Sequence, residues 1–137
     1  MTPKELEERR ALRAARVADA KAEQLSKDLE AVDAAEEEHG GDKTATMHLP
    51  YFTSGMPTLI VVVAPSKPAY KRYRDQAHKS KGAVSGKIID ELADVCVVYP
   101  DPAVFKAMCD EYTSLRDNCF VACLKLAEAK SDAEGKG

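Results

Sequence analysis

Four cysteines and three histidines carry the most reactive side chains of this chain. Cys119 and Cys123 are four residues apart, which places both thiols on one face of a helix. Zinc sites usually hold such thiols in turns, with a second closely spaced pair nearby. Here the cysteines occupy apolar positions of expected helices, where a thiol packs as a small hydrophobic side chain. We therefore predict no metal site and interpret all four as buried, reduced thiols: Cys96, Cys109, Cys119 and Cys123.

A nucleophilic cysteine needs a histidine within reach to activate it. His39, His48 and His78 all lie in polar or boundary segments, and none has a triad-like setting. The sequence also contains no phosphate-binding P-loop, no glycine-rich dinucleotide fingerprint and no acidic metal cluster. We therefore predict that the protein is not an enzyme, with no catalytic residue and no cofactor.

The segment 67–87 is strongly basic, with seven Lys or Arg residues against one Asp. Because tyrosines lie between the charges, phosphate contacts to nucleic acid are one interpretation. An acidic protein partner and a plain solvated face are the other two, and the net charge of -3 and the inward spacing of the tyrosines favour them. The candidate contact residues are Lys71, Arg72, Arg74 and Lys79.

The length and composition of the chain limit its domain organisation and its expected location in the cell. A chain of 137 residues fits one domain with an attached arm. No stretch approaches the ~20 apolar residues of a membrane span. The N-terminus runs directly into charged residues, unlike a signal peptide. We therefore expect a cytosolic protein, in which the thiols stay reduced.

The first forty residues predict a long charged helix. Thr2 can cap it, Pro3 fits its first turn, and strong helix formers continue to about Glu38. A stripe of mostly small apolar residues follows helical spacing: Ala11, Ala15, Ala18, Ala22, Leu25, Leu29 and Val32. A solvated arm outside the core is one interpretation. A self-associating or partner-binding coiled coil is the other, although it needs larger apolar side chains.

Glycines 40 and 41 mark the best boundary in the chain. We divide the sequence into a helical arm (1–40), a small α-helical domain with an N-terminal β-hairpin (41–130) and a polar, disordered tail (131–137). The hairpin is predicted from the apolar runs 47–52 and 58–64, with the first run as an edge strand because Pro50 cannot donate a hydrogen bond. The second run, through Leu59, Val61 and Val63, is a candidate subunit edge.

Four further helices are predicted from apolar spacing. The first two cover about 66–79 and 83–97, with a break at 80–82 between them. Pro100 interrupts the chain, and Asp101 can cap a third helix that carries Phe105 and Met108. The fourth follows Thr113 and Ser114. The fold class is therefore mainly α with a small β-hairpin, in which a long N-terminal helix precedes a compact bundle of about four short helices. The core candidates are Tyr70, Tyr73, Leu92, Cys96, Phe105 and Leu126.

Two motifs stand out in residues 58–128. An apolar strand ends in a Pro-Ser helix start followed by Tyr-Lys-Arg-Tyr-Arg, at 65–74. Leu92 then precedes Cys-Val-Val-Tyr-Pro-Asp, at 96–101, and Phe105. With these motifs the segment resembles the small tail assembly chaperones of long-tailed bacteriophages. The long charged N-terminal helix and the turn at 112–114, where the family pattern has a proline-containing turn, depart from that resemblance.

The resemblance implies a non-enzymatic phage protein that acts in the host cytoplasm. It implies binding to the tape measure protein, which the chaperone keeps soluble, and help in recruiting tail tube subunits, with the chaperone absent from the mature virion. A homo-oligomer, through the hairpin edge or the N-terminal helix, is a further expectation. The alternatives are a structural or adaptor protein of the phage particle, such as a head-tail connector, and a nucleic-acid-binding regulator.

Overall fold

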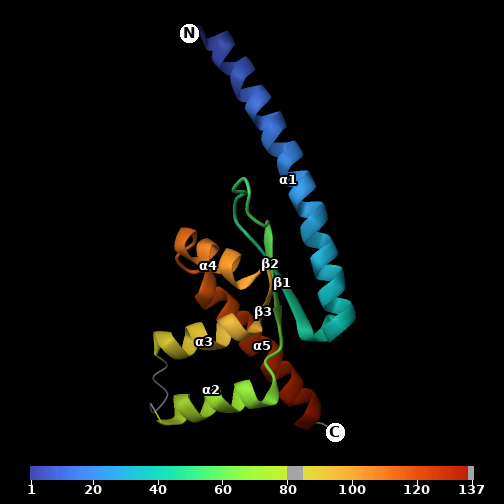
Figure 1. The fold of residues 1–137 in the computed structure, drawn as a ribbon, viewed down its shortest axis with the longest axis vertical. Helices are drawn as coiled ribbons and strands as arrows, with labels where there is room; N and C mark the ends of the chain where they lie inside the picture. The colour runs from blue at the N-terminus through green and yellow to red at the C-terminus, as the bar shows by residue number, and fades with distance from the viewer. Residues whose placement is uncertain (80–84, 136–137) are drawn as a thin grey trace.

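The computed structural model describes residues 1–79 and 85–135, with side chains up to residue 128. Figure 1 shows one long helix standing beside a small sheet, with shorter helices on the other side of the sheet. The elements are α1 (Pro3–His39), a 3-10 turn (Gly41–Lys43), β1 (Thr44–His48), β2 (Leu59–Val63), α2 (Lys67–Lys79), α3 (Gly86–Cys96), β3 (Val97–Tyr99), α4 (Pro102–Glu111) and α5 (Leu115–Gly135). This architecture confirms the predicted fold class.

The sheet is antiparallel, with strand order β1-β2-β3. In the β1–β2 hairpin Thr44 is paired with Val63 and His48 with Leu59. All five residues of β2 are buried. The prediction that Leu59, Val61 and Val63 form a subunit edge is therefore wrong, because β2 is the central strand and has a hydrogen-bonded neighbour on each side.

The two faces of β2 contribute to two different hydrophobic clusters, because alternate side chains of a strand point to opposite faces. Ile60 and Val62 pack with the buried residues of α3, α4 and α5, including Leu92 and Phe105. Leu59 and Val61 pack instead against α1. The fold is thus a three-layer arrangement in which the sheet separates α1 from the shorter helices (Figure 1).

The strands differ from the prediction at two places. The first strand begins at Thr44 rather than Met47 and ends at His48, before Pro50, which fits the missing donor of proline. The third strand, Val97–Tyr99, was not predicted, since its residues were assigned to the end of a helix and a turn. Two valines and a tyrosine suit a strand well, and the Tyr99–Pro100 peptide that follows them is cis.

The short helices lie close to their predicted positions. Asp101 occupies the N-cap position of α4 as expected, although its side chain makes no capping hydrogen bond. Of the core candidates, Leu92, Cys96 and Phe105 are buried, whereas Tyr70, Tyr73 and Leu126 are only half-buried. The predicted break at 80–82 and the residues 83–84 lie outside the described residues. Helix α5 continues to Gly135, so the boundary predicted before residue 131 falls inside it; the sequence there contains no proline to interrupt the helix.

Helix α1 begins and ends at the predicted signals. The Thr2 hydroxyl accepts a hydrogen bond from the Glu5 amide at 3.2 Å, and Gly40 ends the helix with a positive φ of 92°. Only its second half touches the sheet, where Ala35 is buried and Leu25 and Val32 are half-buried. The prediction of the whole segment 1–40 as an arm outside the core is therefore wrong for its second half.

The second half of α1 is held to the sheet by a fully buried carboxylate, Asp28. One carboxylate oxygen accepts hydrogen bonds from the Thr58 amide at 2.7 Å and the Thr58 hydroxyl at 2.6 Å. The other oxygen accepts from the Tyr99 hydroxyl and from the Gln24 side chain at 2.9 Å. We call these four bonds the Asp28 clamp. Three of them join α1 to the start of β2 and to β3, and the bond from Gln24 lies within α1.

Burial alone would raise the pKa of the Asp28 carboxyl. The hydrogen bonds from Thr58, Tyr99 and Gln24 outweigh that effect and hold the pKa below its usual value. Burial, followed by the bond to Asp28, raises the pKa of Tyr99. Asp28 is thus a carboxylate and Tyr99 a neutral donor at neutral pH, and the clamp stays intact.

Candidate functional site: the groove between helices α2 and α3

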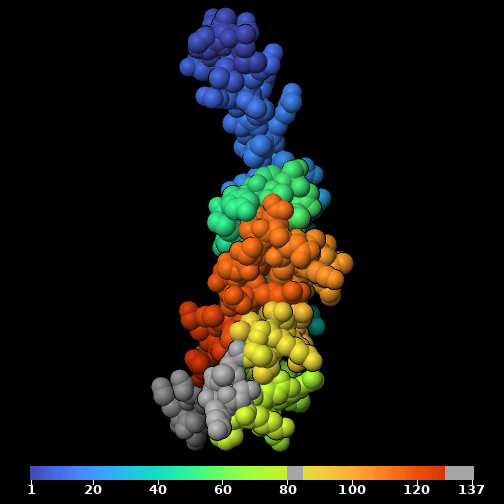
Figure 2. Space-filling view, turned by 90° about the vertical axis from the view of Figure 1, so that its left-hand side faces the viewer, coloured from blue at the N-terminus to red at the C-terminus, as the bar shows by residue number. Residues whose placement is uncertain are grey.

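A groove with a volume of about 420 Å³ lies between α2 and α3. Figure 2 shows these helices side by side near the end of the molecule opposite the N-terminus. Apolar side chains line much of the groove, and charged or polar ones border it: Ala69, Arg72, Tyr73 and Gln76 from α2, and Ile88, Glu91, Leu92, Asp94 and Val95 from α3.

Helix α2 is positioned by its start and by one tyrosine. The Ser66 hydroxyl accepts a hydrogen bond from the Ala69 amide at 3.3 Å, in the manner of an N-cap. Tyr73 lies edge-on to Phe120 of α5, with ring centroids 5.6 Å apart. Burial, followed by the nearby Tyr70, raises the pKa of Tyr73, so its hydroxyl stays neutral at physiological pH. One tyrosine therefore packs α2 on α5 and also lines the groove.

Helix α3 forms the other wall and is more firmly held. Ser85 caps its start, with the Ile88 amide 3.4 Å from the Ser85 hydroxyl. Leu92, Ala93 and Cys96 are buried on its inner side. On its outer side, Asp94 pairs with Arg116 of α5 at 3.2 Å. Val95, in contrast, is 62% exposed, which is unusual for a valine on a well-packed helix.

One ion pair lies across the groove and joins its two walls. The Arg72 guanidinium is 3.7 Å from the Glu91 carboxylate, and both side chains are largely exposed to solvent. Such an exposed pair contributes at most about 1 kcal/mol to stability. A partner that enters the groove can therefore replace this contact at low cost.

The predicted basic contact residues are all exposed, but they do not form one site. Arg72 lines the groove, while Arg74 lies over the ring of Tyr70, 5.9 Å from its centroid. Lys71 and Lys79 are exposed elsewhere on α2. The hydrophobic members of the predicted site, Leu59, Val61 and Val63, are buried in β2, the central strand of the sheet.

The cysteines are packed in the core around α3 and α5. Cys96, Cys119 and Cys123 are buried, and the sulfurs of Cys96 and Cys123 are 3.1 Å apart. The hydrogen bond between these two thiols, together with burial, raises the pKa of Cys96. Burial raises the pKa of Cys119 to about 12. Cys96 and Cys119 are therefore protonated, whereas the hydrogen bond with Cys96 lowers the pKa of Cys123. The described residues include no group of three or more His, Cys, Asp or Glu side chains that could hold a metal ion.

The roles of two residues, Asp28 and Val95, were not predicted from the sequence. Asp28 was not singled out within the predicted charged helix, although its spacing of three and four residues from Leu25 and Val32 was a usable signal. Val95 was assigned to the apolar side of a core helix, yet it is one of the most exposed apolar residues of the chain. Which apolar residues of a helix are buried depends on the elements that pack against it, and the sequence of the helix alone does not show this.

Comparison of the chain with protein-family models, with curated proteins and with solved structures found no significant match. Among the described residues, no helix is both long enough and apolar enough to cross a membrane.

Proposed function

We propose that this protein is a tail assembly chaperone of a long-tailed bacteriophage. In this role it binds the tape measure protein in the host cytoplasm, keeps it soluble and helps to recruit tail tube subunits. It then leaves before the virion is complete. The role is non-enzymatic, and a binding surface is its only requirement.

The proposal rests on one observation: residues from both sequence motifs line the same groove. The first motif, residues 65–74, provides Ala69, Arg72 and Tyr73 to one wall of the groove. The second begins at Leu92, which belongs to the opposite wall. One surface groove is therefore lined by residues of both motifs, namely Ala69, Arg72, Tyr73 and Leu92. Two other residues of the second motif, Cys96 and Phe105, are buried in the core.

The chemistry of the groove suits a helical segment of a protein client. Grooves with an apolar floor bind the apolar face of an amphipathic helix. Tyr73 and Ile88 provide apolar lining, Val95 adds an apolar side chain at the exposed edge, and Arg72 and Glu91 offer both signs of charge at the border. Many weakly bound copies along one extended client would give useful avidity.

Co-expression with the tape measure protein of the same phage tests the proposal. We expect the wild-type chain to keep that protein soluble and to co-elute with it on size exclusion. Val95→Glu places a charge at the exposed edge of the groove and should weaken the complex about tenfold, which corresponds to about 1.4 kcal/mol. Val121→Glu is the matched control, since Val121 on α5 is 47% exposed and does not line the groove.

The proposed function fails if the tape measure protein remains insoluble beside the wild-type chain and no complex forms. Equal binding by both valine variants would instead locate the client elsewhere on the molecule. Mass spectrometry of purified particles separates a chaperone from the alternative structural or adaptor protein. A chaperone is absent or strongly depleted, whereas an adaptor is present in a fixed number of copies.

A further inference from the structure

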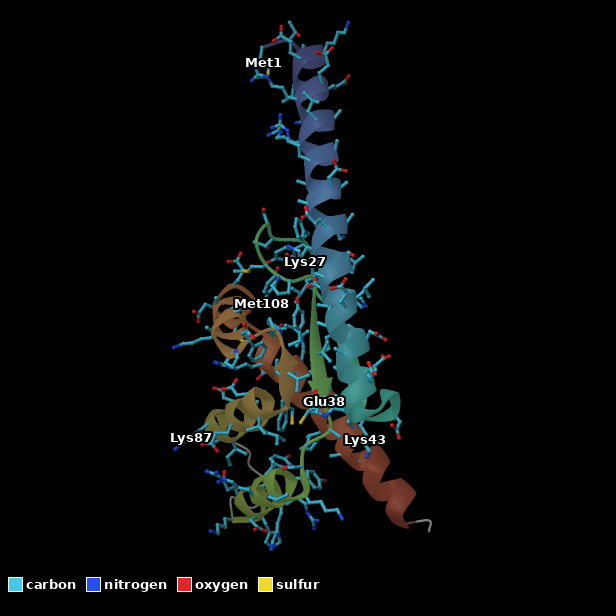
Figure 3. All side chains as sticks on the ribbon, turned by 45° about the vertical axis from the view of Figure 1, so that its right-hand side comes forward. Met1, Lys27, Glu38, Lys43, Lys87 and Met108 are labelled. Atoms are coloured by element: carbon cyan, nitrogen blue, oxygen red, sulfur yellow. The ribbon has the colours of Figure 1, made fainter. Side chains whose placement is uncertain are left out.

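Helix α1 has an exposed face that nothing in the described chain covers. Figure 3 shows that the part of α1 nearest Met1 stands clear of the other elements. Leu12 and Leu29 are 60% and 49% exposed, respectively, and are the two large aliphatic side chains of this face. Ala15, Asp19 and Ala22 lie between them at helical spacing and are also exposed.

This face is not the one that packs on the sheet. The sheet contacts come from Leu25, Asp28 and Val32. Leu29 lies one turn from both Leu25 and Val32, at the border of the side that packs on the sheet, and it remains 49% exposed. A second molecule can therefore cover the face of Leu12 and Leu29 without disturbing the Asp28 clamp.

The charges beside this face are arranged in a self-complementary order. Arg9, Arg16, Glu23 and Glu30 follow one another at intervals of seven residues, so they lie along one side of the helix. The two basic residues come first and the two acidic ones second. All four are exposed, and within the described residues none makes an ion pair within 4.0 Å.

We propose that α1 binds a second copy of itself in antiparallel orientation through this face. Placing Leu12 against Leu29 of the second copy brings Arg9 within one helical turn of Glu30 of that copy, and Arg16 within one turn of its Glu23. Twofold symmetry repeats each contact, because residue i meets residue j and residue j meets residue i. The small side chains of Ala15 and Ala22 let the two helices approach closely.

The charge order selects this orientation and this partner. A parallel pair would place the charged sides of the two helices on opposite flanks of the seam, so that Arg9 and Arg16 would not meet Glu23 or Glu30 of the second copy and the ion pairs would be lost. A uniformly acidic partner would complement the first half of the face and repel the second. A second copy in antiparallel orientation satisfies both halves at once. With only two leucines per helix, the dimer is weak and depends on salt concentration.

Sedimentation equilibrium of the full chain alone, over a range of protein and salt concentrations, tests the dimer. We expect reversible dimers that weaken as salt increases. The double substitution Arg9→Glu/Arg16→Glu should weaken dimerisation at least tenfold, and so should Glu23→Arg/Glu30→Arg. An equimolar mixture of these two variants should regain the wild-type affinity as a heterodimer. A single chain with all four substitutions should regain it as a homodimer.

Arg10→Glu/Arg13→Glu is the matched control, because it makes the same change in net charge on a different side of α1. It should leave dimerisation unchanged, whereas Leu12→Ala/Leu29→Ala should weaken it at least tenfold. Circular dichroism should show wild-type helix content for every variant, since all the changed residues are exposed. The proposal is overturned if the wild-type chain remains monomeric throughout, if the charge-swapped pairs fail to recover, or if the control weakens dimerisation equally. Because no client is present, none of these results depends on the proposed function.

Discussion

The two halves of helix α1 are built from the same kinds of residue and have opposite surroundings. Residues 24–39 lie against the sheet, with Asp28 and Ala35 buried. Residues 3–23 extend for about 30 Å, at 1.5 Å per residue, and include no buried side chain. Both halves are rich in alanine and charged residues, so helix propensity does not separate them. A few side chains at spacings of three and four residues, one of them a carboxylate, decide which half is anchored.

The anchoring is therefore polar as much as hydrophobic. Ala35 and the half-buried Leu25 and Val32 bury little surface between them. The Asp28 clamp adds three hydrogen bonds between α1 and the sheet region, two of them from Thr58 just before the central strand. Bonds to a charged acceptor in a buried site are worth more than bonds between neutral groups. The clamp thus fixes the direction in which the free half leaves the domain.

The largest expected effect comes from the clamp itself. Asp28→Ala leaves the Thr58 amide and the hydroxyls of Thr58 and Tyr99 without their acceptor in a buried site, which should lower the free energy of unfolding by roughly 2–4 kcal/mol. Asp19→Ala is the matched change in the free half and should alter it by less than about 0.5 kcal/mol. Urea unfolding measures both. Similar losses for the two variants would mean that the halves do not differ.

The end of the anchored half is the next most sensitive point. Gly40 has a φ of 92°, which residues with a side chain rarely adopt, and an added Cβ would lie 2.9 Å from the Asp42 carboxylate. Gly40→Ala should therefore cost about 1–2 kcal/mol. Gly41→Ala, where nothing lies within 4 Å of the added atom, is the control. Thermal unfolding of the two variants should show a lower midpoint for Gly40→Ala alone.

A smaller contrast is expected between two valines of the same helix. Val32 packs against the sheet cluster, so Val32→Ala should cost about 1 kcal/mol through lost burial. Val17 is 51% exposed in the free half, and Val17→Ala should be neutral or slightly stabilising because alanine is the better helix former. Chemical denaturation resolves the difference. A loss for Val17→Ala as large as that for Val32→Ala would indicate a contact that the fold does not contain.

The smallest effect is confined to acid pH. Because the folded state lowers the pKa of Asp28, its charge stabilises the fold above the usual Asp pKa, and this contribution is lost as pH falls through the lowered value. The difference in unfolding free energy between wild type and Asp28→Asn should therefore shrink below about pH 4. Unfolding curves recorded between neutral pH and about pH 3 give that difference. A difference that stays constant over this range would contradict the proposed charge state of Asp28.

The contrast between the two halves also explains how far sequence analysis could go. Thr2, Pro3 and Gly40 are local signals, and they located both ends of α1 correctly. The position of Asp28 is set by Thr58 and Tyr99, which are 30 and 71 residues away along the chain, so no local pattern reveals its partners. The run 59–63 was correctly predicted as a strand. Its central place in the sheet was not predicted, because that place depends on pairing with β3. Strand β3 has three residues, and the sequence pattern had assigned them to the end of a helix and a turn.

Some features of the groove between α2 and α3 could likewise be predicted from the sequence, and others could not. The apolar spacing of α3 was readable, and Leu92 and Cys96 are buried as predicted. The exposure of Val95, and the location of Arg72 rather than Arg74 beside the groove, depend on how α2 and α3 pack against each other. Such packing is a long-range property, and a charge pattern along one helix cannot specify it.

Amide hydrogen exchange along α1, measured at a protein concentration low enough to keep the chain monomeric, tests the central claim most directly. An unsupported helix of this length frays, whereas amides held by tertiary packing exchange only through larger openings. We predict weak protection over the free half, a rise near Gln24 and strong protection from Asp28 to Ala35. Uniform protection from one end of α1 to the other would contradict the division of the helix into an anchored and a free half.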